Sequence, residues 1–200
     1  MRFITKHIHG DRAIWAIVSL LSVFSFLPVY SASSNLVYVL EIGSVTGHLI
    51  KHVAIVLIGI SIMYATHRIP FKYFSGLSVI ALPIVWVLLV YTAQQGNMID
   101  GANASRWIKI PILGLSFQTS TLASVVLMVY VARYLSINKD KDIHFWRSLL
   151  VLWLPVLLVI ATILPANLST AALLVALVFV LAFIGGYPKK YLLLMLGTAA

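Results

Sequence analysis

The chain has 200 residues, of which 62% are hydrophobic and 10% charged, and its mean hydropathy is +1.04. Soluble domains carry about 25% charged residues, so this composition excludes an ordinary soluble domain. Fourteen lysines and arginines against five acidic residues give a net charge of +9. The chain has no cysteine, which excludes disulfides, thiolate metal sites and thiol catalysis.

Apolar segments long enough to cross a membrane recur along the chain. A hydrocarbon core about 30 Å thick needs roughly 20 helical residues. The sequence therefore predicts an all-α, polytopic transmembrane bundle forming a single membrane domain, with six full spans and the start of a seventh. In chain order the six predicted spans are 12–32, 49–65, 74–93, 118–135, 148–164 and 168–184, and the seventh begins at residue 191.

The seventh apolar run reaches Ala200, where the sequence stops. Its length is about half of what a bilayer requires. We therefore expect the chain to be either a fragment of a longer protein or a truncated gene product.

Lysine and arginine gather on one side of the predicted spans. With the N-terminus inside, eleven of the 14 fall on the cytoplasmic side. This bias predicts a cytoplasmic N-terminus, since cytoplasmic loops carry the excess of lysine and arginine. The positive charge then acts as a topology signal and contacts anionic lipid headgroups, so no nucleic-acid partner is expected. The outer cations are Lys51, Arg106 and Lys109.

A polar loop at residues 96–109 is predicted at the outer membrane boundary. It contains Asp100, Arg106, Trp107 and Lys109. A guanidinium can hold a phosphate or carboxylate through paired N–H donors, and an indole offers a flat face to a sugar. The alternative is that Arg106 and Trp107 are membrane-interface anchors. Lys109, three residues on, favours a site for an anionic, membrane-borne ligand.

Hydroxyl side chains open the fourth predicted span, in the segment 117–124 (FQTSTLAS). Serine and threonine favour the N-cap position, so Thr119 or Ser120 is predicted to accept backbone N–H bonds there. Such a helix start can also face an anion. Gln118 and Ser120 are therefore candidate ligand-binding residues.

Two further candidates lie at the edges of other predicted spans. Lys51 falls early in the second span, where a charge is costly unless it faces a polar cavity or reaches outward. Asn167 lies between the short fifth and sixth spans, which are predicted to form a tight hairpin, and it either lines a cavity or caps the sixth helix. His48 and His52 lack metal-ligand partners at the usual spacing, so no metal site is expected.

Carboxylates are scarce. The chain has five acidic residues, and only Asp100 and Glu41 fall on the predicted outer side. An enzyme working there would take its general base from one of these or from residues beyond Ala200. The catalytic residue is therefore unassigned.

Four segments match the motifs of one known family in order. Residues 101–102 followed by 105–108 (Gly-Ala, then Ser-Arg-Trp-Ile) resemble its Gly-Ala-x-Arg-Trp-Ile motif. Residues 117–120 resemble its Phe-Gln-Pro-Ser-Glu motif, 167–170 its Asp-Leu-Gly-Thr motif, and 10–33 its first span. The chain thus resembles the FtsW/RodA/SpoVE proteins (the SEDS family), FtsW more than RodA.

The resemblance implies a protein of about ten helices and a peptidoglycan glycosyltransferase that polymerises lipid II outside the bacterial cytoplasmic membrane at the division septum. It implies a class B penicillin-binding protein and other division proteins as partners. The family's proposed catalytic carboxylate lies beyond Ala200, so the present chain alone is expected to be inactive. No cofactor is evident, although a divalent cation (Mg or Mn) could help neutralise the leaving pyrophosphate. The residues expected to bind substrate are Arg106, Trp107, Lys109, Gln118, Ser120, Lys51 and Asn167.

The chain departs from the family motifs at several positions, and the Gly-Ala to Arg spacing is longer by two residues. The substitutions remove two carboxylates and one cation, so an ion pair between the second and third motifs does not carry over. Two other functions stay open: a flippase or transporter for a lipid-linked precursor, and a non-catalytic scaffold of the division complex. The departures are Thr119 for Pro, Thr121 for Glu, Ser124 for Lys, Asn167 for Asp and Ser169 for Gly.

Overall fold

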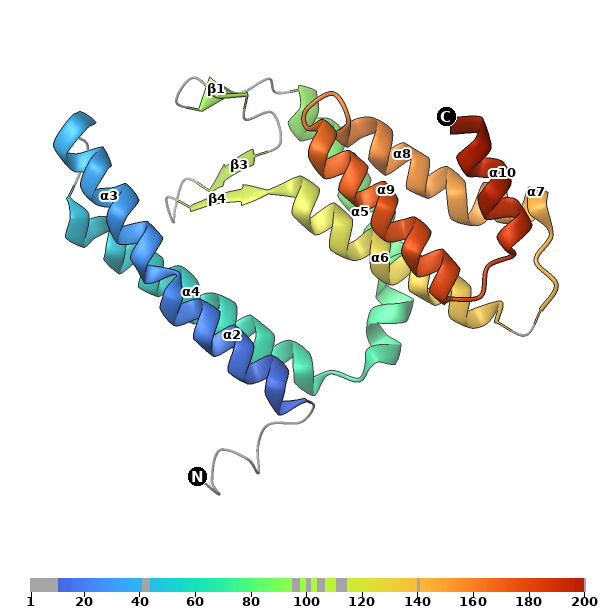
Figure 1. Ribbon diagram of the computed structural model, residues 1–200, viewed down its shortest axis with the longest axis horizontal. Helices are drawn as coiled ribbons and strands as arrows, with labels where there is room; N and C mark the ends of the chain where they lie inside the picture. Colours follow the sequence, from blue (N-terminus) through green and yellow to red (C-terminus); the bar gives the residue numbers. More distant parts are fainter. Residues whose placement is uncertain are drawn as a thin grey trace. The chain divides into compact units, whose positions relative to one another are not determined.

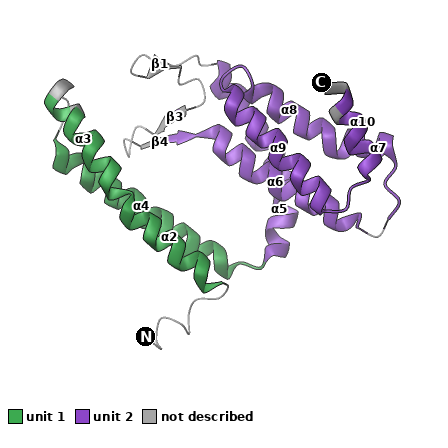
Figure 2. Cartoon of the chain, in the orientation of Figure 1, with its two compact units in different colours: residues 1–70 green, residues 71–200 purple. Residues whose placement is uncertain are grey.

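The computed structural model describes residues 11–40, 44–94, 98–99, 102–103, 107–110, 115–139 and 141–199. The chain divides into two compact units, residues 1–70 and residues 71–200 (Figure 2). The single-domain expectation stays a prediction. Each unit is taken by itself below.

Unit 1 contains the helices α2 (Arg12–Phe24), α3 (Phe26–Leu40) and α4 (Val45–Arg68). The first predicted span is thus two helices that meet at Ser25. The Ser25 hydroxyl donates to the Ser22 carbonyl at 2.7 Å and lies 2.8 Å from His52 Nε2 on α4. Pro28, in the first turn of α3, has no N–H to donate to the Phe24 carbonyl, and its ring crowds that carbonyl, so the helix is interrupted here. The Phe26 ring meets the His52 ring edge-on at 4.9 Å.

Unit 2 contains the remaining elements (Figure 1). Helix α6 packs against α5 and α9, and α8 packs against α5 and α9. The fifth predicted span is composite, because a short α-helix and a π-helical turn precede its main helix. The elements are α5 (Phe71–Gln94), β1 (Met98–Ile99), β2 (Ala102–Asn103), β3 (Trp107–Ile110), β4 (Leu115–Gln118), α6 (Thr119–Ile137), α7 (Phe145–Ser148), the π-helix η1 (Leu149–Trp153), α8 (Leu154–Ile163), α9 (Leu168–Ile184) and α10 (Lys189–Ala199).

Within the described residues, five helical segments are long and apolar enough to cross a membrane, and α9 is a shorter apolar helix of 17 residues. The all-α, polytopic membrane architecture is therefore confirmed. The sixth predicted span coincides with α9, and the start of the seventh corresponds to α10.

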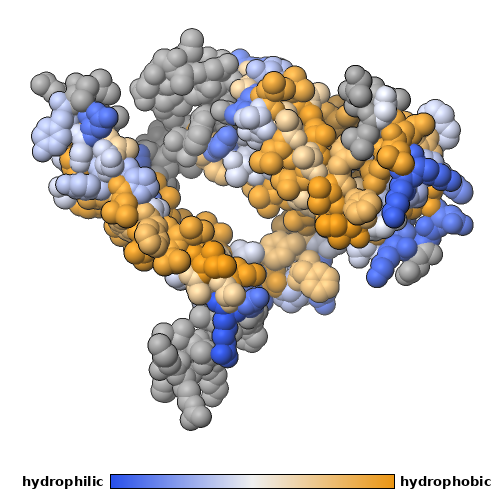
Figure 3. Space-filling model, viewed as in Figure 1, coloured by the Kyte–Doolittle hydropathy of each residue, from blue (hydrophilic) through white to orange (hydrophobic). Residues whose placement is uncertain are grey.

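Small side chains mark the closest helix packing in unit 2. Ala123 on α6, and Ala171 and Ala182 on α9, are fully buried. Apolar side chains of α8 and α9 such as Leu157 and Leu173 remain exposed, and hydrophobic surface covers much of the molecule (Figure 3). Lipid solvates leucine as well as a core does, so close packing rather than the hydrophobic effect holds these helices together.

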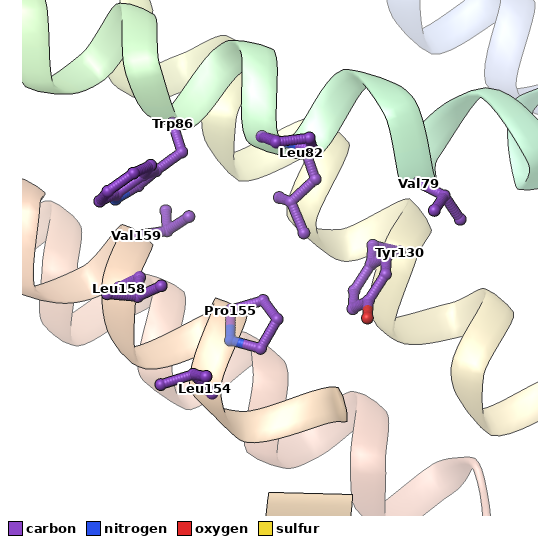
Figure 4. Close-up of a pocket in the computed structure, with 9 residues that line it drawn as sticks. Val79, Leu82, Trp86, Tyr130, Leu154, Pro155, Leu158 and Val159 are labelled. Carbon is purple, nitrogen blue, oxygen red and sulfur yellow. The ribbon is translucent and has the colours of Figure 1, made fainter. Parts of the chain in front are cut away.

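A cavity of about 270 Å³ lies between α5, α6 and α8 (Figure 4). Pro83 of α5 and Pro155 of α8 both line it. Pro155 has no N–H, so it cannot donate to the Val151 carbonyl four residues earlier. The Tyr130 hydroxyl on α6 donates to that carbonyl at 2.6 Å. It thereby supplies a hydrogen bond that water cannot supply inside a membrane.

Replacing Tyr130 with phenylalanine is expected to destabilise the protein by about 0.6–1.7 kcal/mol, the range of hydrogen bonds between membrane helices. The cost should shrink in a Pro155→Ala background, because the restored N–H can bond the Val151 carbonyl itself. A double-mutant cycle of unfolding in detergent measures this coupling. Equal costs in both backgrounds would contradict the repair role of Tyr130.

Candidate functional site

The polar loop predicted at the outer boundary and the residues up to Gln118 form two short antiparallel hairpins. Strand β1 pairs with β2, and β3 pairs with β4. In the second hairpin Trp107 lies opposite Gln118, and Lys109 lies opposite Ser116. Trp107 and Ile108 of one motif are therefore brought into register with Gln118 and Phe117 of another by backbone hydrogen bonds.

Helix α6 follows β4 without a loop and begins at Thr119. The N-cap residue is Gln118, and no side-chain capping bond forms there among the described residues. The prediction that Thr119 or Ser120 caps this helix is therefore wrong. The Gln118 amide oxygen instead accepts a hydrogen bond from the Thr121 hydroxyl at 3.0 Å.

Thr119 turns toward α5 instead of capping its own helix. Its hydroxyl lies 3.0 Å from the hydroxyl of Thr92, near the end of α5. Thr92 donates back to the Leu89 carbonyl at 2.9 Å, so Thr119 is the donor to Thr92. Both side chains are buried. Thr92, Thr119 and Ser120, the buried residue that follows Thr119 in the chain, are together called the hydroxyl cluster; only the two threonines are hydrogen-bonded to each other.

Ser120 is 1% exposed, and its hydroxyl has no hydrogen-bond partner among the described residues. A buried, unsatisfied polar group costs about 1–3 kcal/mol, and few native groups are left in that state. Its backbone carbonyl accepts from Ser124 at 2.8 Å. The Ser120 hydroxyl is therefore a polar group at the start of α6 whose donor and acceptor are left unsatisfied by the described residues.

Asn167 caps helix α9. Its side-chain oxygen accepts from the Thr170 backbone N–H at 2.9 Å and from the Ser169 hydroxyl at 2.7 Å. Of the two alternatives for Asn167, the structure thus shows the cap. The predicted tight hairpin between the fifth and sixth spans is formed by α8, α9 and the turn between them.

The other predicted site residues are less fully placed. Lys51 is exposed on α4 of unit 1. For Trp107 and Lys109 the backbone pairing is described and the side chains are not. Arg106 and Asp100 lie outside the described residues.

Two features of this region escaped the sequence reading. Strands β3 and β4 carry alternating apolar and polar residues (WIKI and LSFQ) around a Pro-Ile-Leu-Gly segment, a pattern typical of a hairpin. Thr92 ends an apolar span and gave no comparable signal. Among the described residues there is no group of three or more His, Asp or Glu side chains that could hold a metal ion; a divalent cation stays a prediction.

The comparison with known families agrees with the order of these motifs. Residues 11–200 match the family model of the FtsW/RodA/SpoVE cell cycle proteins. The chain belongs to the FtsW/RodA/SpoVE family. With its apolar helices, this membership establishes a multi-pass membrane protein.

Curated members of the FtsW/RodA/SpoVE family are similar to this chain at low identity. The probable peptidoglycan glycosyltransferase FtsW of Geobacter sulfurreducens is 29% identical over 188 residues, which cover 92% of this chain and 49% of that protein. The corresponding FtsW of Idiomarina loihiensis is 31% identical over 132 residues, 66% of this chain and 31% of that protein. The peptidoglycan glycosyltransferase RodA of Treponema pallidum is 24% identical over 151 residues, 72% of this chain and 33% of that protein. The chain thus spans about half the length, or less, of these relatives.

Proposed function

We propose that this chain forms the N-terminal part of a peptidoglycan glycosyltransferase that polymerises lipid II at the outer face of the cytoplasmic membrane during septal cell-wall synthesis. Family membership and the names of the similar proteins, which are peptidoglycan glycosyltransferases, support the reaction class. The single structural observation that carries the site is the buried Ser120 hydroxyl at the start of α6, which has no hydrogen-bond partner in the part of the chain that the structure describes. A class B penicillin-binding protein and other division proteins are the proposed partners.

The chemistry of the hydroxyl cluster suits a pyrophosphate-linked sugar. Hydroxyl and amide groups donate to phosphate oxygens and also bond sugar hydroxyls, and Ser120 and Gln118 supply both kinds of group. Arg106 and Lys109, on or beside strand β3, would add the cationic part that stabilises charge on a leaving pyrophosphate. The role of Lys51 stays a prediction from the sequence.

The hydrogen bonds at the start of α6 accommodate two of the departures from the family motif. Thr119 and Thr121 stand where the motif has Pro and Glu. Each hydroxyl has a neutral partner, Thr92 for the first and Gln118 for the second. Neutral, hydrogen-bonded threonines thus stand at the start of α6 where the family motif has a charged glutamate. The general base is proposed to come from outside this chain segment.

Replacing Ser120 with alanine tests the proposed site. In the full-length protein with its penicillin-binding partner, lipid II polymerisation is expected to fall about tenfold or more, because a hydrogen bond to a charged group contributes about 1.5–3 kcal/mol. The unfolding temperature in detergent should stay the same or rise, since an unsatisfied buried hydroxyl is removed. The assay follows glycan strand formation from purified lipid II.

The matched control is Ser124→Ala, one helical turn further on. Its hydroxyl bonds the Ser120 carbonyl within the helix, so its loss should leave polymerisation within about twofold. If Ser120→Ala polymerises lipid II like the unmodified protein, the proposed site is wrong. If the full-length protein forms no polymer although the division complex assembles, the scaffold function replaces the polymerase.

A further inference from the structure

An apolar groove lies near the C-terminal end of α9, the end away from Asn167. It has a volume of about 350 Å³. Helix α9 supplies Phe179, Val180 and Phe183, and α10 supplies Leu192 and Leu193. More than half of the surface of Val180, Phe183 and Leu193 is exposed. The groove therefore opens on the outside of unit 2 and faces whatever surrounds these helices.

One charged side chain joins the apolar walls of the groove. Lys189, the first residue of α10, lines it, and its Nζ lies 5.5 Å from the centre of the Phe183 ring. An aliphatic lysine stem packs along apolar surface while its ammonium stays at the polar boundary. The groove is therefore apolar along its length and cationic at one end.

The groove is held in shape by the turn between α9 and α10. Gly186 adopts a φ of +79°, a conformation that favours glycine. The next residue, Tyr187, is buried, and its hydroxyl lies 2.6 Å from that of Ser148. The Phe145 ring contacts the Tyr191 ring on α10 at 5.1 Å. These contacts hold the turn and the first turn of α10 against α7, and the Tyr187 N–H donates to the Ala182 carbonyl of α9 at 3.0 Å.

Further cations share this end of unit 2. Lys190 lies with its Nζ 5.0 Å from the Tyr191 ring centre, and Arg147 is two residues from Phe145. Hydrophilic surface gathers there beside the hydrophobic surface of the helices (Figure 3). The lysine and arginine bias predicts that this end is cytoplasmic, where the leaflet carries anionic lipids.

We propose that the groove between α9 and α10 binds an anionic phospholipid of the cytoplasmic leaflet. One acyl chain lies along the five apolar side chains, and the headgroup phosphate meets the Lys189 ammonium. An amphiphile with a negative head matches both the cation at one end and the apolar walls. The site is independent of the proposed polymerase function, because it lies toward the opposite end of α9 from Asn167 and needs no lipid II.

The test measures lipid binding to the purified full-length protein by native mass spectrometry, with phosphatidylglycerol as the probe and phosphatidylcholine as the neutral comparison. We expect Lys189→Ala to weaken phosphatidylglycerol binding about fivefold. A lysine near an anionic membrane surface contributes about 1 kcal/mol of binding free energy, which corresponds to that change in affinity. Val180→Trp, which fills the groove and keeps the charge, should weaken binding of the same lipid. Leu193→Trp serves as the second filling variant if the first fails to fold.

The matched control is Lys72→Ala. Lys72 also lies against an aromatic ring, 5.4 Å from the centre of Tyr73, and does not line the groove. Binding should be unchanged in this variant. Equal weakening in Lys72→Ala and Lys189→Ala would show a general charge effect and overturn the proposal. Normal phosphatidylglycerol binding by the groove-filling variant would also overturn the proposal. That result is expected if another segment of the protein covers the groove.

Discussion

Replacing Gly185 with alanine is expected to destabilise the protein by about 1–3 kcal/mol, the usual cost of inserting a methyl group into a packed interior. A Cβ at this position would lie 2.7 Å from Leu135 Cδ1, 3.1 Å from Leu135 Cβ and 3.0 Å from the Leu181 carbonyl oxygen. Two of these atoms move only with the α6 or α9 backbone. Thermal unfolding in detergent measures the change.

The control for this prediction is Gly76→Ala on α5. No described atom lies within 4 Å of a Cβ added there, and alanine favours a helix by about 1 kcal/mol over glycine. The two variants should therefore shift the unfolding temperature in opposite directions. A shift of the same sign and size in both would show that α6 and the end of α9 are not in close contact.

Replacing Tyr187 with phenylalanine is expected to destabilise the protein by about 1–3 kcal/mol, because it leaves a buried donor without an acceptor. The Ser148 hydroxyl donates to the Phe145 carbonyl at 2.9 Å, so in the 2.6 Å contact Tyr187 is the donor to Ser148. The Trp153 indole N–H donates to the Tyr187 oxygen at 3.2 Å. All three side chains are buried.

The substitution Tyr187→Phe affects the two hydrogen-bond partners of Tyr187 differently. Without the Tyr187 oxygen, Trp153 loses its acceptor, whereas Ser148 keeps its bond to the Phe145 carbonyl. Tyr191→Phe is the matched control, since Tyr191 packs its ring on Tyr187 and is half-buried. Its substitution should change the unfolding temperature little. If both variants unfold at the unmodified temperature, the buried network does not contribute to stability.

The spans could be predicted because their signal is local. A run of apolar residues must form a helix in a bilayer, since every backbone group needs an internal partner. Residues 168–184 were predicted as a span, and α9 begins and ends at the same residues. The interruption at Ser25 has a local signal in Pro28 that the span prediction did not use, whereas the contact of Ser25 with His52 on α4 could come only from the structure.

The candidate site shows the same division. The motif order led to Gln118 and Ser120 from the sequence, and both residues lie where β4 passes into α6. The capping role given to Thr119 was wrong because a threonine 27 residues away, Thr92, offers its hydroxyl a partner. Local propensity favours the cap, but the packing of α5 against α6 supplies the competing bond.

By itself, the sequence determined that this protein is a helical membrane protein, where its spans lie and to which family it belongs. Hydropathy, charge bias and motif order are properties of the chain alone. Only the tertiary structure decided that Thr119 bonds Thr92 on another helix, that the Ser120 hydroxyl is buried without a partner among the described residues, and that Lys189 lies at one end of an apolar groove. Each of these depends on how the helices pack against one another, which hydropathy, charge bias and motif order do not encode.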